Sequence, residues 1–148
     1  MTKFSVKRSL SYSSSQIFDL VIDIESYPDF LPWCVSAKEY GDNKEKFRAD
    51  LEIGFNLFNQ SFSSEITAVY PKKIISKAVS GPFEVLKNEW LFNESDRYIC
   101  NIELNIEFKF KSIVLQKLMG KVFEHSSKKM IDAFEKRAKQ LYGEHKLL

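Results

Sequence analysis

The feature that most constrains the fold is a strict alternation of apolar and polar residues over 98–110. The apolar positions are Tyr98, Cys100, Ile102, Leu104, Ile106, Phe108 and Phe110. A period of two places one face of a strand in the core and the other face in water. Strands of parallel sheets are usually buried on both faces, so this pattern predicts an antiparallel sheet with one apolar face.

The period then changes, and residues 112–142 follow a helical pattern. A helix of this length is roughly 45 Å long, which is enough to cross a sheet. Gly143 follows where a helix C-cap is expected. The predicted apolar stripe consists of Leu115, Met119, Phe123, Ser126, Met130, Ala133 or Phe134, and Leu141.

The remaining segments predict one further helix and several short strands. Ser13 and Gln16 have the spacing of a capping box, and a helix is predicted over 14–25. The two prolines of segment 27–33 favour a short helical turn or a tight loop. Strands are predicted at 4–10, 34–40, 47–53, 62–70, 73–79, 84–92 and 98–110.

The apolar face of the sheet and the apolar stripe of the helix must cover each other. We therefore predict an α+β fold in which a curved antiparallel sheet of about six to seven strands wraps around a long C-terminal helix. Such a curl can enclose a cavity. The chain is interpreted as a single domain over 1–148, with an ordered core of about residues 2–142.

Composition and motifs exclude several classes of function. The formal net charge of +2 argues against a protein that mainly neutralises nucleic-acid phosphates, although it permits a local basic patch. No apolar run approaches the ~18 residues of a membrane span, and no leader pattern is found. Cys34 and Cys100 are interpreted as reduced core thiols of a cytoplasmic protein.

No catalytic or metal-binding residues are predicted. His125 and His145 lack partner ligands at zinc spacing, and no serine lies in a nucleophile-elbow context. The lysines of the C-terminal third have two interpretations, a solvated helix face or a docking surface for RNA or anionic lipid. Gly120, inside the predicted helix, also has two interpretations. Its small size leaves room either for an apolar ligand or for close helix–sheet packing.

The aromatic segment 27–34, with the sequence YPDFLPWC, places large apolar groups on a proline-bounded loop. Such a loop is typical of a lid, an interface or a membrane contact, or of a plug at the open end of the sheet. The segment closely resembles the signature of the coenzyme Q-binding START-domain family. Residues 81–83 (GPF), 90–92 (WLF) and 108–112 (FKFKS) match later landmarks of that family in order.

This family belongs to the START-like, or polyketide cyclase, superfamily, and the resemblance implies a helix-grip (Bet v-like) fold. It also implies two functions. Some members bind ubiquinone and support respiratory electron transfer and quinone biosynthesis. Others are ribosome association toxins, which bind the large ribosomal subunit and block its joining to the small one. No catalytic constellation is shared across the group.

Our first hypothesis is a non-enzymatic carrier or chaperone of ubiquinone or a similar prenyl lipid, with no cofactor beyond that ligand. A transient contact with the inner membrane is compatible with this hypothesis, and DNA is not an expected partner. The predicted lining or gating residues are Tyr27, Phe30, Trp33, Phe62, Trp90, Met119, Phe123 and Met130. The apolar–polar alternation of segment 84–92 does not decide whether the Trp90 side chain points into the cavity or outward.

The second hypothesis is a toxin that binds the large ribosomal subunit. It expects the lysine-rich helix face to contact RNA. The third is a cyclase or dehydratase enzyme. This activity requires ionisable groups inside the cavity, and the candidates are Glu65, Glu89 and Arg8.

Overall fold

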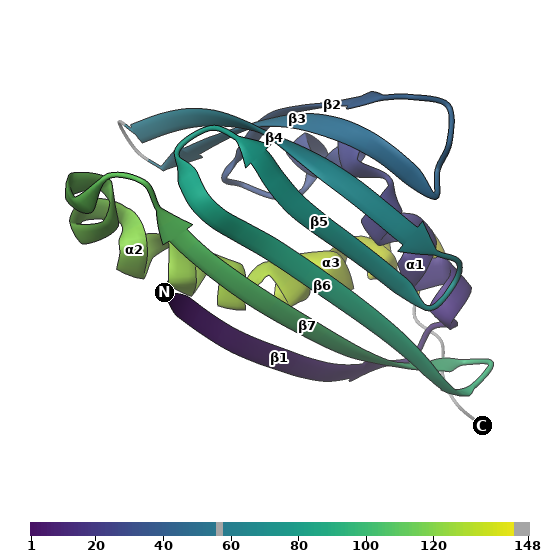
Figure 1. The fold of residues 1–148 in the computed structure, drawn as a ribbon. Helices are drawn as coiled ribbons and strands as arrows, with labels where there is room; N and C mark the ends of the chain where they lie inside the picture. The colour runs from purple at the N-terminus through teal and green to yellow at the C-terminus, as the bar shows by residue number, and fades with distance from the viewer. Residues whose placement is uncertain (56–57, 144–148) are drawn as a thin grey trace.

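A single seven-stranded antiparallel sheet organises the protein, with strand order β1-β7-β6-β5-β4-β3-β2. The structure is a computed structural model that describes residues 1–55 and 58–143. The elements in chain order are β1 (Thr2–Leu10), α1 (Ser14–Ile22), the 3₁₀ helix η1 (Ile24–Asp29), β2 (Cys34–Tyr40), β3 (Lys46–Phe55), β4 (Phe58–Val69), β5 (Lys73–Ser80), β6 (Phe83–Asp96), β7 (Ile99–Phe110), α2 (Ile113–Lys128) and α3 (Met130–Tyr142). Figure 1 shows the sheet curling over the helices.

The predicted fold class is confirmed, because a curved antiparallel sheet covers a long C-terminal helical segment. The alternation that predicted β7 is visible in its burial, since Leu104, Ile106 and Phe108 are almost fully buried. Register shifts in the β4–β5 and β6–β7 pairs bend the strands locally. These bends add to the natural twist and give the sheet its concave inner face.

The predicted N-terminal helix begins with a capping box. The backbone N–H of Gln16 donates to Ser13 Oγ at 3.1 Å, and the backbone N–H of Ser13 donates to the side-chain Oε1 of Gln16 at 3.0 Å. The predicted range 14–25 was too long, because α1 ends at Ile22 and the chain continues into η1. The turn of helix expected near Tyr27 is therefore this 3₁₀ segment.

The prediction of one unbroken helix over 112–142 was wrong, because α2 and α3 are separated at Lys129. The Lys129 amide still bonds to the carbonyls of His125 and Ser126 at 3.3 and 3.2 Å. The buried stripe continues across the break, so the pattern gave no signal of it. Leu141, which was assigned to this stripe, is instead 51% exposed.

Arg8 interrupts the apolar face of β1 because it connects that edge strand to α3. Its guanidinium donates to the Asp132 carboxylate and to Glu135 Oε1, the latter at 3.1 Å. The hydrogen bond to Asp132 is the main reason why the pKa of Arg8 is raised. This contact attaches the C-terminal helical segment to one edge of the sheet.

No helix in the described ranges 1–55 and 58–143 is long and apolar enough to cross a membrane. Within the same residues, no three His, Cys, Asp or Glu side chains come together in a way that could hold a metal ion.

We predict that Gly81→Ala destabilises the fold more than Gly41→Ala does. Both glycines have positive φ, of +112° and +106°. A Cβ at Gly81 would lie 2.5 Å from Phe62 Cβ, whereas at Gly41 it would meet nothing closer than 3.7 Å. Backbone strain costs of order 1–3 kcal/mol at either site, and the clash adds to it at Gly81 alone. Urea unfolding of the two variants measures the difference, and equal losses would contradict the prediction.

Candidate functional site

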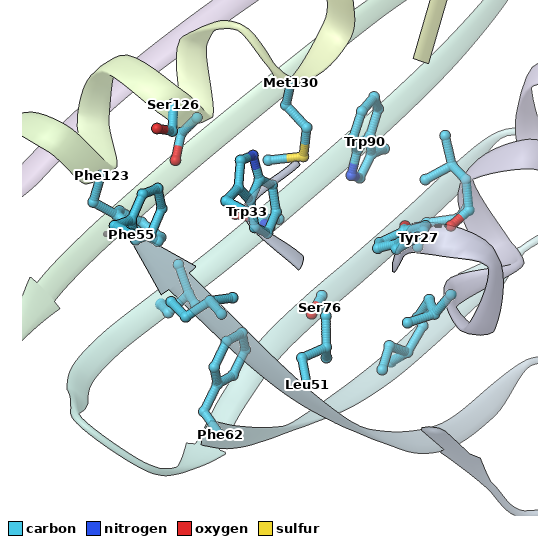
Figure 2. Close-up of a pocket in the computed structure, with 18 residues that line it drawn as sticks. Tyr27, Trp33, Leu51, Phe55, Phe62, Ser76, Trp90, Phe123, Ser126 and Met130 are labelled. Atoms are coloured by element: carbon cyan, nitrogen blue, oxygen red, sulfur yellow. Dashed lines mark hydrogen bonds between the residues drawn. The ribbon is translucent and has the colours of Figure 1, made fainter. Parts of the chain in front are cut away.

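An enclosed cavity of about 60 Å³ lies between the concave face of the sheet and the helices. Figure 2 shows its labelled side chains converging from the strands, the η1 region and the helices. Its lining consists of Val21, Ile24, Tyr27, Trp33, Leu51, Ile53, Phe55, Phe62, Ile66, Ile74, Ser76, Leu86, Asn88, Trp90, Phe123, Ser126, Ser127 and Met130. The walls are thus mainly apolar, with a few polar groups.

Six of the eight predicted site residues surround this cavity, namely Tyr27, Trp33, Phe62, Trp90, Phe123 and Met130. Trp90, whose direction was open, points inward and is 3% exposed. Phe30 does not line the cavity, because its ring packs against Phe134 with the centroids 5.1 Å apart. Met119 is buried but also lies outside the lining.

A cluster of phenylalanines fills the α2 end of the core. Phe123 contacts the rings of Phe83 and Phe108 at 5.1 and 4.7 Å, and Phe83 stacks on Phe110 at 4.7 Å. Several of the chain's 13 phenylalanines are therefore used in packing. Large rings fill this end, so the hollow is confined to the region beyond Phe123.

Tyr27 anchors the aromatic segment above the cavity. Its hydroxyl donates to the carbonyl of Val21, and burial raises the pKa of this hydroxyl above its ordinary value. Its ring packs edge-on against Phe134 at 5.4 Å. Leu31 on the same segment is fully buried. The segment therefore closes the open end of the sheet, as the plug interpretation expects.

Two polar side chains face the cavity from neighbouring strands. Ser76 on β5 and Asn88 on β6 are opposite one another in the register. The Oδ1 atom of Asn88 is buried and has no hydrogen-bond partner among the described residues. A buried unpaired acceptor costs about 1–3 kcal/mol, so this atom favours a partner that the chain itself does not supply. Neither residue is predictable from the sequence pattern, because polar positions on a half-buried strand are expected on the outer face.

Ionisable groups are nearly absent from the wall. Among the lining residues of the described chain, Tyr27 is the one with a titratable side chain. The three groups that an enzyme hypothesis would need lie elsewhere. Arg8 binds α3, Glu65 is exposed on β4, and Glu89 accepts from Asn105 Nδ2 at 3.0 Å.

A wider recess of about 550 Å³ opens to solvent next to the cavity. The cavity and the recess share four lining residues, Trp33, Phe55, Ser126 and Met130. The rings of Trp33 and Phe55 are stacked with their centroids 6.4 Å apart. These shared side chains form the partition between the closed interior and the outside.

Gly120 serves packing and does not line the cavity. A Cβ at this position would lie 2.6 Å from Gln116 Nε2. The Gln116 side chain reaches back so that its Oε1 accepts from the Phe110 amide at 3.1 Å. The glycine therefore leaves room for a side chain of its own helix that caps the end of β7. Neither space for a ligand nor close packing of helix on sheet, the two interpretations from the sequence, describes this contact.

The chain belongs to the polyketide cyclase / dehydrase and lipid transport family, whose profile matches residues 10–135. The resemblance drawn from the aromatic segment is thereby confirmed at the level of the family. One relative, from Rickettsia prowazekii, is named ribosome association toxin RatA. It is 37% identical over 145 residues, which cover 95% of this chain and 99% of that protein.

A second relative, from Xenopus laevis, is named coenzyme Q-binding protein COQ10 homolog B, mitochondrial. It is 32% identical over 145 residues, which are 95% of this chain and 59% of that protein. Among solved structures, the Zhui aromatase/cyclase from Streptomyces sp. R1128 superposes with a TM-score of 0.83 at 12% identity, covering 94% of each chain. The last similarity shows the fold alone.

We predict that stability falls in alkali partly through Cys34, the last residue of the aromatic segment. Burial raises the pKa of this thiol to about 11 from its ordinary 9.0. Its contribution is complete below about pH 9 and is lost as the pH rises to about 11, because only the unfolded chain releases the proton in that window. The free energy of unfolding should fall by up to ~1.4 kcal/mol per pH unit for this group.

Cys34→Ala should therefore reduce the slope with which the free energy of unfolding falls between about pH 9 and 11. Urea unfolding at several pH values measures both slopes. The lost side-chain volume shifts the whole curve of the variant but does not change its slope. Parallel curves for the two proteins across that window would refute the assignment.

Proposed function

We propose that the protein binds an apolar small molecule of the prenyl-quinone class and carries it without changing it chemically. The observation that supports this most directly is the apolar cavity with Asn88 Oδ1 unpartnered in its wall. Small-molecule sites typically combine apolar walls with a few polar groups that fix orientation. The reduced form of a prenyl quinone has a hydroxyl donor at each side of its ring and an apolar tail, which fits an acceptor in such a wall. The carbonyl of the oxidised form would accept from the Asn88 Nδ2 instead.

Asn88 and Ser76 are the groups that would bind the head. An amide offers both an acceptor and a donor, so Asn88 can accept from a hydroquinone hydroxyl or donate to a quinone carbonyl. Tyr27 is a weaker candidate, because its hydroxyl already donates to the Val21 carbonyl. The apolar side chains around the amide exclude water, which strengthens each such hydrogen bond.

The size of the cavity requires that the partition opens when a ligand binds. A volume of about 60 Å³ is smaller than the roughly 150 Å³ engineered cavity that accepts benzene. Displacement of Trp33, Phe55 and Met130 would join the cavity to the 550 Å³ recess, which has room for a tail. Met130 is suited to this because methionine is unbranched and flexible, and it directly follows the helix break at Lys129.

Fluorescence quenching tests the proposal, because both tryptophans of the chain, Trp33 and Trp90, line the cavity. A short-tailed ubiquinone should quench them saturably, since a quinone accepts an electron from an excited indole ring. Protein purified from cells that make quinones should also release prenyl quinone on solvent extraction, detected by mass spectrometry. Absence of both saturable quenching and extracted quinone would contradict the proposal.

Asn88→Leu provides the site-specific arm of this experiment. Loss of the head contact should weaken quinone binding by roughly ten-fold or more. Binding of a prenyl hydrocarbon without head oxygens, measured by competition, should not weaken. The matched control is Asn93→Leu, the same change at an exposed position of the same strand. Equal quinone affinity of the two variants would remove Asn88 from the site.

Ribosome association is a second candidate, favoured by the near full-length match to the Rickettsia relative. We propose it as a surface function that does not need the cavity. Sucrose-gradient profiles after overproduction should then show fewer joined ribosomes and more free subunits. The Asn88→Leu variant should act like the wild type in this assay. Unchanged profiles for the wild type would exclude the candidate.

A further inference from the structure

Helix α2 exposes a row of apolar side chains to solvent. Val114, Leu118 and Val122 are 63%, 67% and 43% exposed. A spacing of four residues places them on one helix face, and we call these three residues the α2 stripe. Ile113, 74% exposed, lies at the start of the same helix. The opposite face of α2, with Met119 and Phe123, is already buried against the sheet. The stripe is therefore a second apolar face without a partner in the described chain.

Lysines flank the α2 stripe, and no acidic residue lies among them. Lys111, Lys117 and Lys121 are exposed, and none forms an ion pair within the residues that the structure describes. By contrast, Lys109 and Lys128 lie 3.1 and 3.8 Å from carboxylates. Segment 110–123 contains no Asp or Glu. The surface around the stripe is thus positively charged and not neutralised locally.

The α2 stripe leads to the mouth of the cavity. Val122 lines the outer recess together with Trp33 and Phe55. Figure 1 shows α2 at the same end of the molecule as the adjoining ends of β3 and β4, where Phe55 is paired with Phe58. An apolar surface on α2 is therefore continuous with the opening through which a ligand would pass.

We propose that the α2 stripe docks on an anionic lipid bilayer, with Lys111, Lys117 and Lys121 at the level of the lipid head groups. An apolar row beside lysines is the pattern of a helix that lies in a membrane interface. This inference extends the proposed function, because docking would place the recess against the bilayer. An apolar ligand could then move between lipid and cavity without crossing water.

The charge distribution favours a bilayer over the other occupants of such a face. RNA phosphates would pair with the lysines but would leave the α2 stripe exposed to water. A second copy would bury the stripe, but a two-fold contact at its centre would bring the same lysines of both copies together. An anionic bilayer satisfies both features, since it offers negative head groups above an apolar interior.

Vesicle flotation tests the proposal with purified full-length protein. Wild type should bind phosphatidylcholine vesicles that contain roughly 30% phosphatidylglycerol and should bind phosphatidylcholine alone far less. Val114→Ser/Leu118→Ser should reduce binding to the anionic vesicles by about ten-fold or more, through loss of apolar burial. Lys117→Gln/Lys121→Gln should reduce it roughly five-fold per lysine.

Matched variants on β4, β5 and the turn between them control for general surface changes. Val69→Ser/Val79→Ser removes two exposed valines, and Lys72→Gln/Lys77→Gln removes two exposed lysines. Both should bind the anionic vesicles like the wild type. Thermal melts of every variant establish that it is folded.

Three outcomes would overturn the inference. In the first, the wild type fails to float with anionic vesicles. In the second, the stripe variant floats as well as the wild type. In the third, the stripe variant loses self-association in sedimentation or loses binding to a homopolymer RNA, while vesicle binding is unchanged. Quinone quenching of the stripe variant in solution separates this test from the proposed function, because Val114 and Leu118 do not line the cavity or the recess.

Discussion

The structure depends on one constraint, that the apolar concave face of the sheet must be covered by helices. Along β7 and the phenylalanine cluster, large side chains from both layers meet and fill the space. Along β5 and β6 the sheet contributes Ser76 and Asn88, and α2 contributes Ser126 opposite them. These smaller side chains do not fill the space between the layers. The cavity is therefore a consequence of side-chain size at particular positions on a fold that is otherwise closely packed.

The sequence predicted best what short-range patterns determine. Alternation over 98–110 predicted β7 and its buried face, and Ser13 with Gln16 predicted the start of α1. The break at Lys129 was not predictable in this way, since neither proline nor glycine marks it and the buried stripe continues through it. Position on the cavity wall was predictable only in part, because it depends on which layers face each other. Tyr27 and Phe30 belong to one motif and both rings pack against Phe134, yet Tyr27 lines the cavity and Phe30 does not.

The partition made by Trp33, Phe55, Ser126 and Met130 determines how the interior can be used. Its side chains are held by packing, whereas the backbone of Trp33 is fixed to β3, because the Gly54 amide donates to the Trp33 carbonyl at 2.9 Å. Stacking of aromatic rings adds only about 0.5–1.5 kcal/mol beyond burial, so the main cost of separating these side chains is the apolar surface that they expose. A bound apolar ligand would cover that surface again. Movement of these side chains alone leaves the sheet and the contacts of Arg8 with α3 in place.

The two functions proposed for this chain would use different parts of the molecule, ligand binding its interior and ribosome association its surface. In this chain the two parts meet at α2. Val122 belongs to the exposed stripe and also lines the recess, and His125 and Lys129 line the recess from the same helical segment. Any large partner seated on this face would therefore cover the opening of the cavity as well. Ligand exchange and surface binding are then coupled by geometry alone, whichever partner the surface has.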